Sequence, residues 1–120
     1  MLKVKTYLDK SDIHGIGVFA DEDIEENQTI WEFDERFDKV IQHNDNEVTF
    51  INTYAYYDKQ LRQWILPSDN DRFTNHSETP NTKLLDNGLV IALRKISKDE
   101  ELTVNYYDID KFAHHKLKFI

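Results

Sequence analysis

The segment FTNHSETPN, residues 73–81, gathers several polar side chains that could do chemistry. His76 could exchange a proton near neutral pH, and Asn75 offers both a donor and an acceptor of hydrogen bonds. The same residue types are also ordinary loop material, because Ser, Thr and Asn bond to nearby backbone and Pro fixes its own φ angle. Taken alone, this segment therefore predicts a loop.

Two other segments carry residues of possible functional use. Two of the three glycines in the chain flank Ile16 in GIGVFA, residues 15–20. Gly is unfavourable inside a strand, so this pair predicts either a close approach of the backbone to another group or a tight turn. Tyr106 lies in EELTVNYYD, residues 100–108, where a tyrosine late in a strand is usually a core residue.

Composition excludes several classes of protein. A chain of 120 residues is expected to form one domain, with a core over about 3–108 and a tail over 109–120. The absence of cysteine excludes disulfides, thiol nucleophiles and Cys-ligated zinc. The adjacent His114 and His115 would point apart in an extended tail, so no metal site is expected.

The charge and hydropathy pattern indicates the kind of partner. With 23 acidic and 15 basic residues, the net charge is −8, which argues against direct nucleic-acid binding and is compatible with a basic protein partner. No apolar run approaches the ~20 residues of a membrane span, and the first residues lack the apolar part of a signal peptide. We expect no membrane association and an intracellular location, with the cytoplasm as the expected compartment.

The elements that must position these residues are mostly short strands. Apolar alternation and turn residues predict strands over 2–9, around Ile30, Trp31 and Phe33, and over 102–107, and hairpins over 56–66 and 82–96, the second turning at Asp86-Asn87-Gly88. A short helix is expected between residues 44 and 57, ending near the tyrosines, with Asn46 as its N-cap. No βαβ unit is present, which excludes a Rossmann dinucleotide site. The pattern indicates a mainly β, or β-rich α+β, domain.

The three segments GIGVFA, RFTNHSETPN and EELTVNYYD occur in an order that resembles the SET-domain protein lysine methyltransferases. Members of that family typically show Gly-x-Gly, then Arg-Phe-x-Asn-His-Ser-x-x-Pro-Asn, then Glu-Leu-x-x-Asp-Tyr. The resemblance covers about residues 3–108 and is nearest to the minimal bacterial and viral type, which lacks pre-SET and post-SET cysteine modules. It implies several small β-sheets, similar to a β-clip, and a C-terminal pseudoknot in which the Asn-His-Ser loop threads against the C-terminal segment.

The resemblance also implies site residues and a cofactor, S-adenosyl-L-methionine. The residues implied to bind that cofactor are Gly15, Ile16, Gly17, Arg72, Phe73, Asn75, His76, Tyr106 and Phe112, the last as a cover for the adenine. Tyr106 would be the catalytic tyrosine, and a channel for the substrate lysine would contain Tyr54, Tyr56 and Tyr106. His76 is expected to be a structural hydrogen-bonding residue and not a general base. Hydrophobic packing remains an alternative for Tyr54 and Tyr56.

The implied reaction is methyl transfer to the ε-amine of a lysine in a protein. A lysine with a pKa near 10.4 must lose its proton first, at a cost of about 4.6 kcal/mol at pH 7, so we expect a pH optimum above neutral. Two departures from the family pattern are Glu78, where many members have Cys, and Asn105, where Asp is usual. A homodimer is possible for a domain that lacks closing modules, and the alternative function is a catalytically silent module that binds a peptide or itself.

Overall fold

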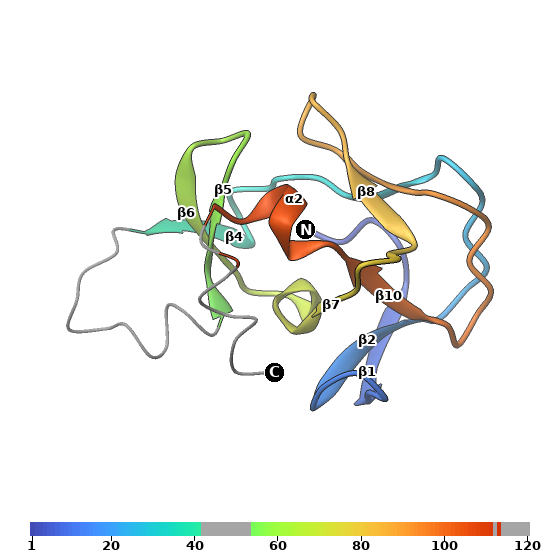
Figure 1. The fold of residues 1–120 in the computed structure, drawn as a ribbon. Helices are drawn as coiled ribbons and strands as arrows, with labels where there is room; N and C mark the ends of the chain where they lie inside the picture. The colour runs from blue at the N-terminus through green and yellow to red at the C-terminus, as the bar shows by residue number, and fades with distance from the viewer. Residues whose placement is uncertain (42–53, 112, 114–120) are drawn as a thin grey trace.

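The chain folds into short strands arranged in three small sheets with little helix (Figure 1). The structure is a computed structural model and describes residues 1–41, 54–111 and 113. The strand-rich class predicted from the sequence is confirmed. Most of the helix predicted between residues 44 and 57 lies outside the described residues, and Tyr56 already belongs to a strand.

The strands are distributed over the sheets as follows. The first sheet has the order β1-β2-β10-β7, with β1 at Thr6–Lys10, β2 at Ile16–Ala20, β10 at Glu101–Val104 and β7 at Asn75–His76. The second has the order β3-β9-β8, with β3 at Thr29–Trp31, β9 at Val90–Ala92 and β8 at Thr82–Leu84. The third has the order β4-β6-β5, with β4 at Asp38–Ile41, β6 at Gln63–Pro67 and β5 at Tyr56–Asp58. The 3-10 helix η2 spans Asn70–Phe73 and the helix α2 spans Tyr106–Ile109.

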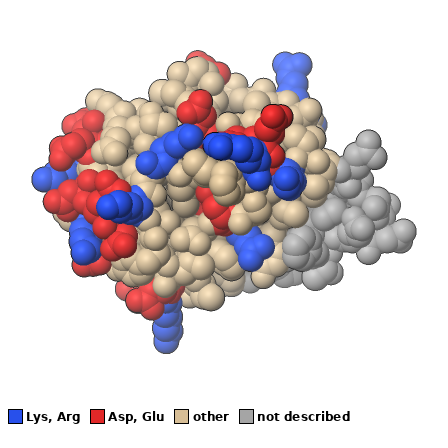
Figure 2. Space-filling model, turned by 180° about the vertical axis from the view of Figure 1, so that it is seen from behind, with Lys and Arg blue, Asp and Glu red and all other residues tan. Residues whose placement is uncertain are grey.

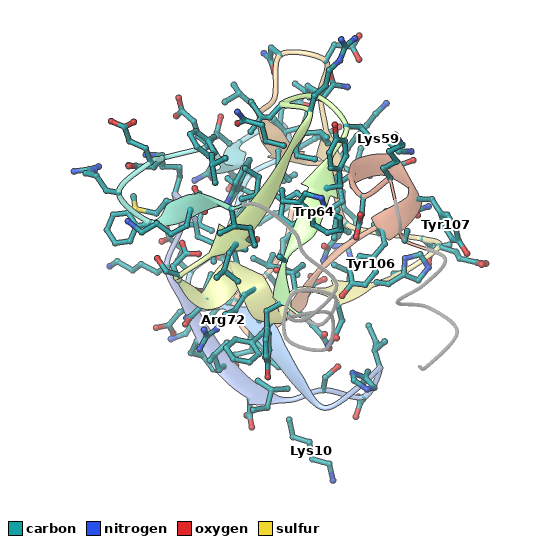
Figure 3. The ribbon with its side chains drawn as sticks, turned by 90° about the vertical axis from the view of Figure 1, so that its left-hand side faces the viewer. Lys10, Lys59, Trp64, Arg72, Tyr106 and Tyr107 are labelled. Atoms are coloured by element: carbon teal, nitrogen blue, oxygen red, sulfur yellow. The ribbon has the colours of Figure 1, made fainter. Side chains whose placement is uncertain are left out.

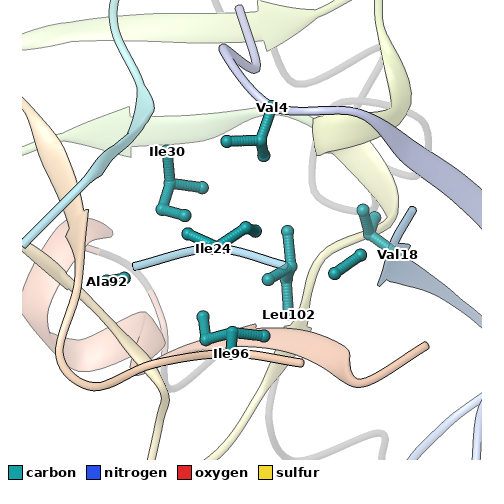
Figure 4. Packing of buried hydrophobic residues seen from close by; sticks show 8 residues of the cluster. Val4, Val18, Ile24, Ile30, Ala92, Ile96 and Leu102 are labelled. Atoms are coloured by element: carbon teal, nitrogen blue, oxygen red, sulfur yellow. The ribbon is translucent and has the colours of Figure 1, made fainter. Parts of the chain in front are cut away.

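One apolar cluster holds the first two sheets together (Figure 4). Its buried members are Val4, Val18, Ala20, Ile24, Ile30, Ala92, Ile96 and Leu102. Each fully buried Leu, Ile or Val side chain stabilises the fold by roughly 1.5–3 kcal/mol. The cluster therefore provides a rigid base for β2 and β10, the two strands that carry or adjoin the sequence motifs.

The Asn-His-Ser segment crosses beside the C-terminal strand. β7 pairs with β10 in parallel, with Asn75 opposite Thr103 and His76 opposite Val104. The sequence analysis predicted this contact between the loop and the C-terminal segment. Parallel pairing requires a long connection between the strands, and here residues 77–100 supply it.

Asn81, the last residue of the FTNHSETPN segment, fastens this crossing. Its side-chain amide donates to the carbonyl of Glu101 at 2.8 Å, and its Oδ1 accepts from the backbone N–H of Thr103 at 2.9 Å. The hydroxyl of the next residue, Thr82, donates to the carbonyl of Thr103 at 2.6 Å. Asn81 is buried, so these bonds satisfy polar groups that would otherwise be costly to bury.

The strand predicted over 102–107 is wrong in its last part. β10 ends at Val104, and Tyr106 starts the helix α2. The reason is the cap: the side chain of Asn105 accepts a hydrogen bond from the N–H of Tyr107 at 3.0 Å, as an N-cap does. Asn and Asp serve equally well at this position, so the Asn105 departure from the family pattern does not disturb the turn.

The other local predictions succeed to different degrees. Both hairpins are confirmed, as β5–β6 and as β8–β9, and Gly88 turns the second with φ +87°. The first strand was predicted to begin at residue 2 but begins at Thr6, because Leu2 makes only an isolated bridge to Trp31. The strand predicted around Ile30, Trp31 and Phe33 spans Thr29–Trp31, so Phe33 lies outside it. The strand β4 was not predicted, since it depends on pairing with the distant β6.

Acidic and basic side chains are intermixed over the described part of the surface seen in Figure 2. Close ion pairs join Arg36 to Asp34 at 2.6 Å and Arg94 to Glu100 at 2.9 Å. Exposed pairs of this kind contribute little to stability, about 0–1 kcal/mol each. Among the described residues, no helix has the length and apolar character needed to cross a bilayer.

Candidate active site

A cavity of about 80 Å³ lies where the sheets meet α2. Its lining includes Tyr54, Tyr56 and Tyr106, the three residues predicted to form a lysine channel. Val104 and Leu102 form part of the apolar wall of the cavity. The polar lining comes from other residues, which are described below. The fold thus brings together three tyrosines from segments that are about fifty residues apart. Their role as a channel stays a prediction.

Tyr106 is held at both ends by the Asn-His-Ser segment. Its backbone N–H donates to Nδ1 of His76 at 3.1 Å, and its hydroxyl donates to the carbonyl oxygen of Thr74 at 2.6 Å. Burial raises the pKa of Tyr106, and the nearby charge of Asp71 raises it further. The hydroxyl therefore stays protonated at neutral pH and can orient a neighbouring group, but it cannot serve as a base.

His76 contributes through its ring nitrogen and its position. Because Nδ1 accepts a hydrogen bond from a backbone N–H, the neutral ring carries its proton on Nε2. The His76 ring lies 5.3 Å from the ring of Tyr106 and 5.8 Å from that of Tyr107, measured between centroids. This arrangement fits the expected structural role of His76.

Tyr106 and its neighbour Tyr107 take different positions on α2. In Figure 3, Tyr106 lies on the inner side of the helix and Tyr107 lies at the edge of the molecule. Tyr107 is 49% exposed and does not line the cavity. Of these two neighbouring tyrosines, only Tyr106 is therefore placed to act in the cavity.

Hydrogen bonds and a cation–π contact fasten α2 to the β5 strand. The side chain of Asp110 accepts from the N–H of Tyr57 at 3.2 Å, and the N–H of Lys111 donates to the carbonyl of Tyr57 at 3.0 Å. The Lys111 ammonium lies 5.4 Å from the centroid of the Tyr57 ring. Lys59, labelled beside α2 in Figure 3, donates to the carbonyl of Tyr107. These contacts fix the position of Tyr106 relative to β5.

The two predicted cofactor segments touch each other directly. The side-chain amide of Asn75 donates to the carbonyls of His14 at 3.0 Å and Ile16 at 3.2 Å. It also lies 2.9 Å from Oε2 of Glu101. Asn75 is buried, so its side chain is used to position the glycine loop, and a ligand at this loop would meet backbone groups.

Gly17 is required for a reason that the sequence analysis did not foresee. A Cβ atom at this position would lie 2.5 Å from Oε2 and 2.8 Å from Cδ of Glu101. The Glu101 carboxylate cannot move away easily, because the Ser11 hydroxyl lies 2.7 and 3.0 Å from its two oxygens. The close approach at Gly17 is therefore to a protein carboxylate. Position 15 has open space around it and favours glycine for a different reason, its φ of +49°.

The Arg72 guanidinium packs against the aromatic rings of Phe73 and Tyr54, and the three side chains form one group. The Arg72 guanidinium carbon lies 5.5 Å from the centroid of Tyr54 and 4.9 Å from that of Phe73. The two rings meet edge to face, 6.1 Å apart. Such a group presents both a planar cation and ring faces, which suit a ligand with an aromatic or anionic part. Phe112, the predicted adenine cover, lies outside the described residues.

Asp71 is the residue of the cavity that the sequence analysis missed. It lies in η2, lines the cavity, and its Oδ1 accepts from the hydroxyl of Thr74 at 3.2 Å. Burial raises its pKa to about 7, and the negative charge of Asp69 acts in the same direction. The only sequence signal was an acidic residue directly before the Arg-Phe pair, which a loop prediction does not distinguish from surface charge.

The Asp71→Asn variant should be more stable than the wild type at alkaline pH. The pKa of the carboxyl is about 7 in the folded protein against an ordinary value of 3.8. Between these two pH values the folded state therefore binds one proton more than the unfolded state. The contribution of this proton to the free energy of unfolding is fully present below about pH 4 and is lost as the pH rises through 7. The shift corresponds to at most ~4 kcal/mol, and we expect roughly half because the amide is still a buried polar group.

Urea unfolding at pH 4.5 and pH 8 measures this difference. Asp71→Asn should be about 1 kcal/mol less stable than the wild type at pH 4.5 and about 2 kcal/mol more stable at pH 8, because the cost of the buried amide is the same at both pH values. Asp86→Asn makes the same change at an exposed turn and should be neutral at both pH values. Equal stability of the wild type and Asp71→Asn at pH 8 would contradict a raised pKa of Asp71.

Comparison with known proteins identifies the family. The family model of the SET domain matches residues 15–107. The chain is 31% identical over 126 residues to a histone-lysine N-methyltransferase, H3 lysine-36 specific, of Candida albicans, and 30% identical over 128 residues to the histone-lysine N-methyltransferase trr of Drosophila melanogaster. These matches cover 87% and 90% of this chain, but the chain spans only 14% and 5% of the length of those relatives.

Solved structures agree with this result at the level of the fold. A candidate histone methyltransferase of Plasmodium falciparum matches with a TM-score of 0.60 and 26% identity, over 88% of this chain and 95% of the other. The Polycomb Repressive Complex 2 of Chaetomium thermophilum, in a structure bound to S-adenosylmethionine, matches with a TM-score of 0.62 and 23% identity, over 99% of this chain and 17% of the other. Together with the ordered motifs and the crossing of β7 and β10, these matches lead to one conclusion: the chain belongs to the SET-domain family.

Proposed function

We propose that this chain is an S-adenosylmethionine-dependent protein-lysine N-methyltransferase. The observation that carries the proposal is the cavity that unites Tyr54, Tyr56 and Tyr106. An aromatic cavity of this kind disfavours an ammonium ion through loss of hydration and so favours the neutral amine that the reaction needs. The relatives with 30–31% identity are named histone-lysine N-methyltransferases, which supports the same activity.

The residues of the two cofactor segments fit such a ligand. Asn75 ties the backbone of the glycine loop to β7, and Ile16 in that loop is 50% exposed. The polar backbone there and the ring faces around Arg72 would hold the amino-acid and adenine parts of the cofactor. When bound, S-adenosylmethionine supplies a methyl group on a positively charged sulfur.

Tyr106 has the catalytic role in this proposal. Its hydroxyl donates its proton to the carbonyl of Thr74, and the hydroxyl oxygen, as an acceptor, would receive an N–H of the substrate amine. This contact would aim the lone pair of the amine at the methyl group, and such alignment accounts for much of the rate of an in-line displacement. The enzyme then needs no metal and no covalent intermediate.

The proposed substrate is a basic protein that contains lysine. The relatives are named for action on histones, and the net charge of −8 favours encounter with a basic partner. Purified core histones are therefore the first substrate to test. Mass spectrometry of the product would identify the lysine and the number of methyl groups added.

Two measurements test the function. Isothermal titration should detect S-adenosylmethionine binding, and incubation with labelled cofactor should transfer methyl groups to core histones. No binding at millimolar cofactor would refute the proposal. Cofactor binding by both the wild type and Tyr106→Phe, without transfer by either to histones or to a whole-cell protein extract, would favour a silent binding module.

A further inference from the structure

We propose that the carboxyl group of Asp71 receives the proton of the substrate lysine inside the cavity, so that methyl transfer starts from a neutral amine. The inference rests on the proposed function, because it assigns a catalytic task within the same cavity. Asp71 comes from η2 and lines that cavity together with Tyr56 and Tyr106.

Thr74 forms one hydrogen bond with Asp71 and a separate one with Tyr106, the tyrosine proposed as catalytic. Thr74 accepts from the hydroxyl of Tyr106 through its carbonyl oxygen at 2.6 Å, and its own hydroxyl donates to Oδ1 of Asp71 at 3.2 Å. Both groups are therefore fixed by one residue. A carboxylate has about four lone-pair positions, so the bond from Thr74 leaves capacity for an amine.

The other polar side chains of the cavity are less suitable proton acceptors. Burial and the Asp71 charge raise the pKa of Tyr56 and Tyr106, so both keep their protons. Arg72 is a permanent cation. Asp110 is the remaining carboxylate of the lining, and its bond from the backbone N–H of Tyr57 holds it against β5, whereas Asp71 is bonded to Thr74, the residue that also holds the hydroxyl of Tyr106. Asp71 is thus the best candidate among the described lining residues.

The surroundings of Asp71 raise the proton affinity of its carboxyl group, as accepting a proton from lysine requires. Burial and the negative charges of Asp69 and Asp38 raise its pKa, the Met1 ammonium and the Thr74 hydroxyl act in the opposite direction, and the net result is a pKa of about 7. The same loss of hydration lowers the pKa of an entering lysine. In water these two groups differ by about 6.5 pKa units, and the cavity narrows that difference from both sides.

The step balances as follows. The lysine enters as an ammonium ion paired with the carboxylate, an N–H bond breaks, and an O–H bond forms on Asp71, which leaves both groups neutral. The lone pair of Nζ then forms a bond to the methyl carbon, and the electrons of the carbon–sulfur bond stay with sulfur. The product is a methylated ammonium, and the proton on Asp71 leaves to water when the product does.

The pH dependence of the rate tests this assignment. The probe is methyl transfer to purified core histones between pH 5.5 and 10, by the wild type, by Asp71→Asn and by Asp86→Asn as the exposed control. At subsaturating histone, where the rate reports the free enzyme, the wild-type rate should reach half of its maximum near pH 7 and then level off. At pH 7 the Asp71→Asn rate should be at least tenfold lower, and it should keep rising by up to tenfold per pH unit toward pH 10, where free lysine loses its proton.

A second measurement needs neither cofactor nor turnover. Carbon-13 NMR of the aspartate carboxyls should reveal one resonance that titrates near pH 7 and is missing in Asp71→Asn. The probe n-butylamine resembles the lysine side chain, and at saturation it should lower that midpoint by at least one pH unit, because its ammonium form favours the carboxylate. The uncharged n-butanol should leave the midpoint unchanged.

The outcomes separate the inference from the function on which it rests. If the wild type transfers methyl groups and Asp71→Asn follows the same pH profile, the inference fails and the proposed function stands. A midpoint that does not respond to n-butylamine also overturns the inference. If the wild type transfers no methyl group at any pH, the proposed function fails, and the assignment of Asp71 fails with it.

Discussion

Replacing Tyr106 by Phe should lower kcat for methyl transfer by about 100-fold, which corresponds to ~2.7 kcal/mol. The hydroxyl that is removed is held by the carbonyl of Thr74 at 2.6 Å, so in the wild type its oxygen has one defined position in the cavity. Without it, an amine in the cavity loses the acceptor that would aim its lone pair. Single-turnover rates with core histones and saturating S-adenosylmethionine measure this loss.

The same variant should still fold and bind cofactor. It loses one hydrogen bond, which costs about 1 kcal/mol of stability, while the backbone bond from Tyr106 to His76 is unchanged. The control is Tyr107→Phe, which removes a hydroxyl from the exposed neighbour and should keep the rate within about twofold. An unchanged rate in Tyr106→Phe would show that another tyrosine of the cavity, Tyr54 or Tyr56, has the catalytic role.

Replacing Gly17 by Ala should destabilise the protein by about 3 kcal/mol. The new Cβ would lie 2.5 Å from a Glu101 carboxylate oxygen and 3.1 Å from Cβ of Ser11. Relief requires movement of a carboxylate that is bonded to Ser11 and Asn75, and loss of those bonds would also release the glycine loop from β7. Urea unfolding at pH 7 gives the free energy directly.

Two further variants show whether the clash is the cause. Gly15→Ala has open space around the new Cβ and should cost only about 1 kcal/mol, through its positive φ. Combining Gly17→Ala with Glu101→Ala removes the carboxylate that the new Cβ meets. The double variant should then lose less stability than the sum of the losses in Gly17→Ala and Glu101→Ala. Equal effects of Gly17→Ala and Gly15→Ala would mean that Glu101 moves without cost.

The parts of the fold predicted correctly from the sequence depend on local chemistry. The β8–β9 hairpin follows from a turn with glycine at a positive φ, and the β5–β6 hairpin follows from two β-rich runs joined by a polar turn. The end of β10 was missed although a local signal existed. The β-propensity of the two tyrosines suggested a longer strand, whereas Asn105 caps a helix there.

The sequence by itself determined the family and the set of motif residues, because order, spacing and residue type are properties of the chain. It could not determine burial or charge environment, which depend on partners far away in the sequence. Glu101 meets Gly17 and Asn75, and Asp71 shares a cavity with Tyr56 and Tyr106, only after the sheets have packed. Tertiary structure alone therefore set the close contact at Gly17 and the raised pKa of Asp71, since the first follows from close packing and the second from lost hydration.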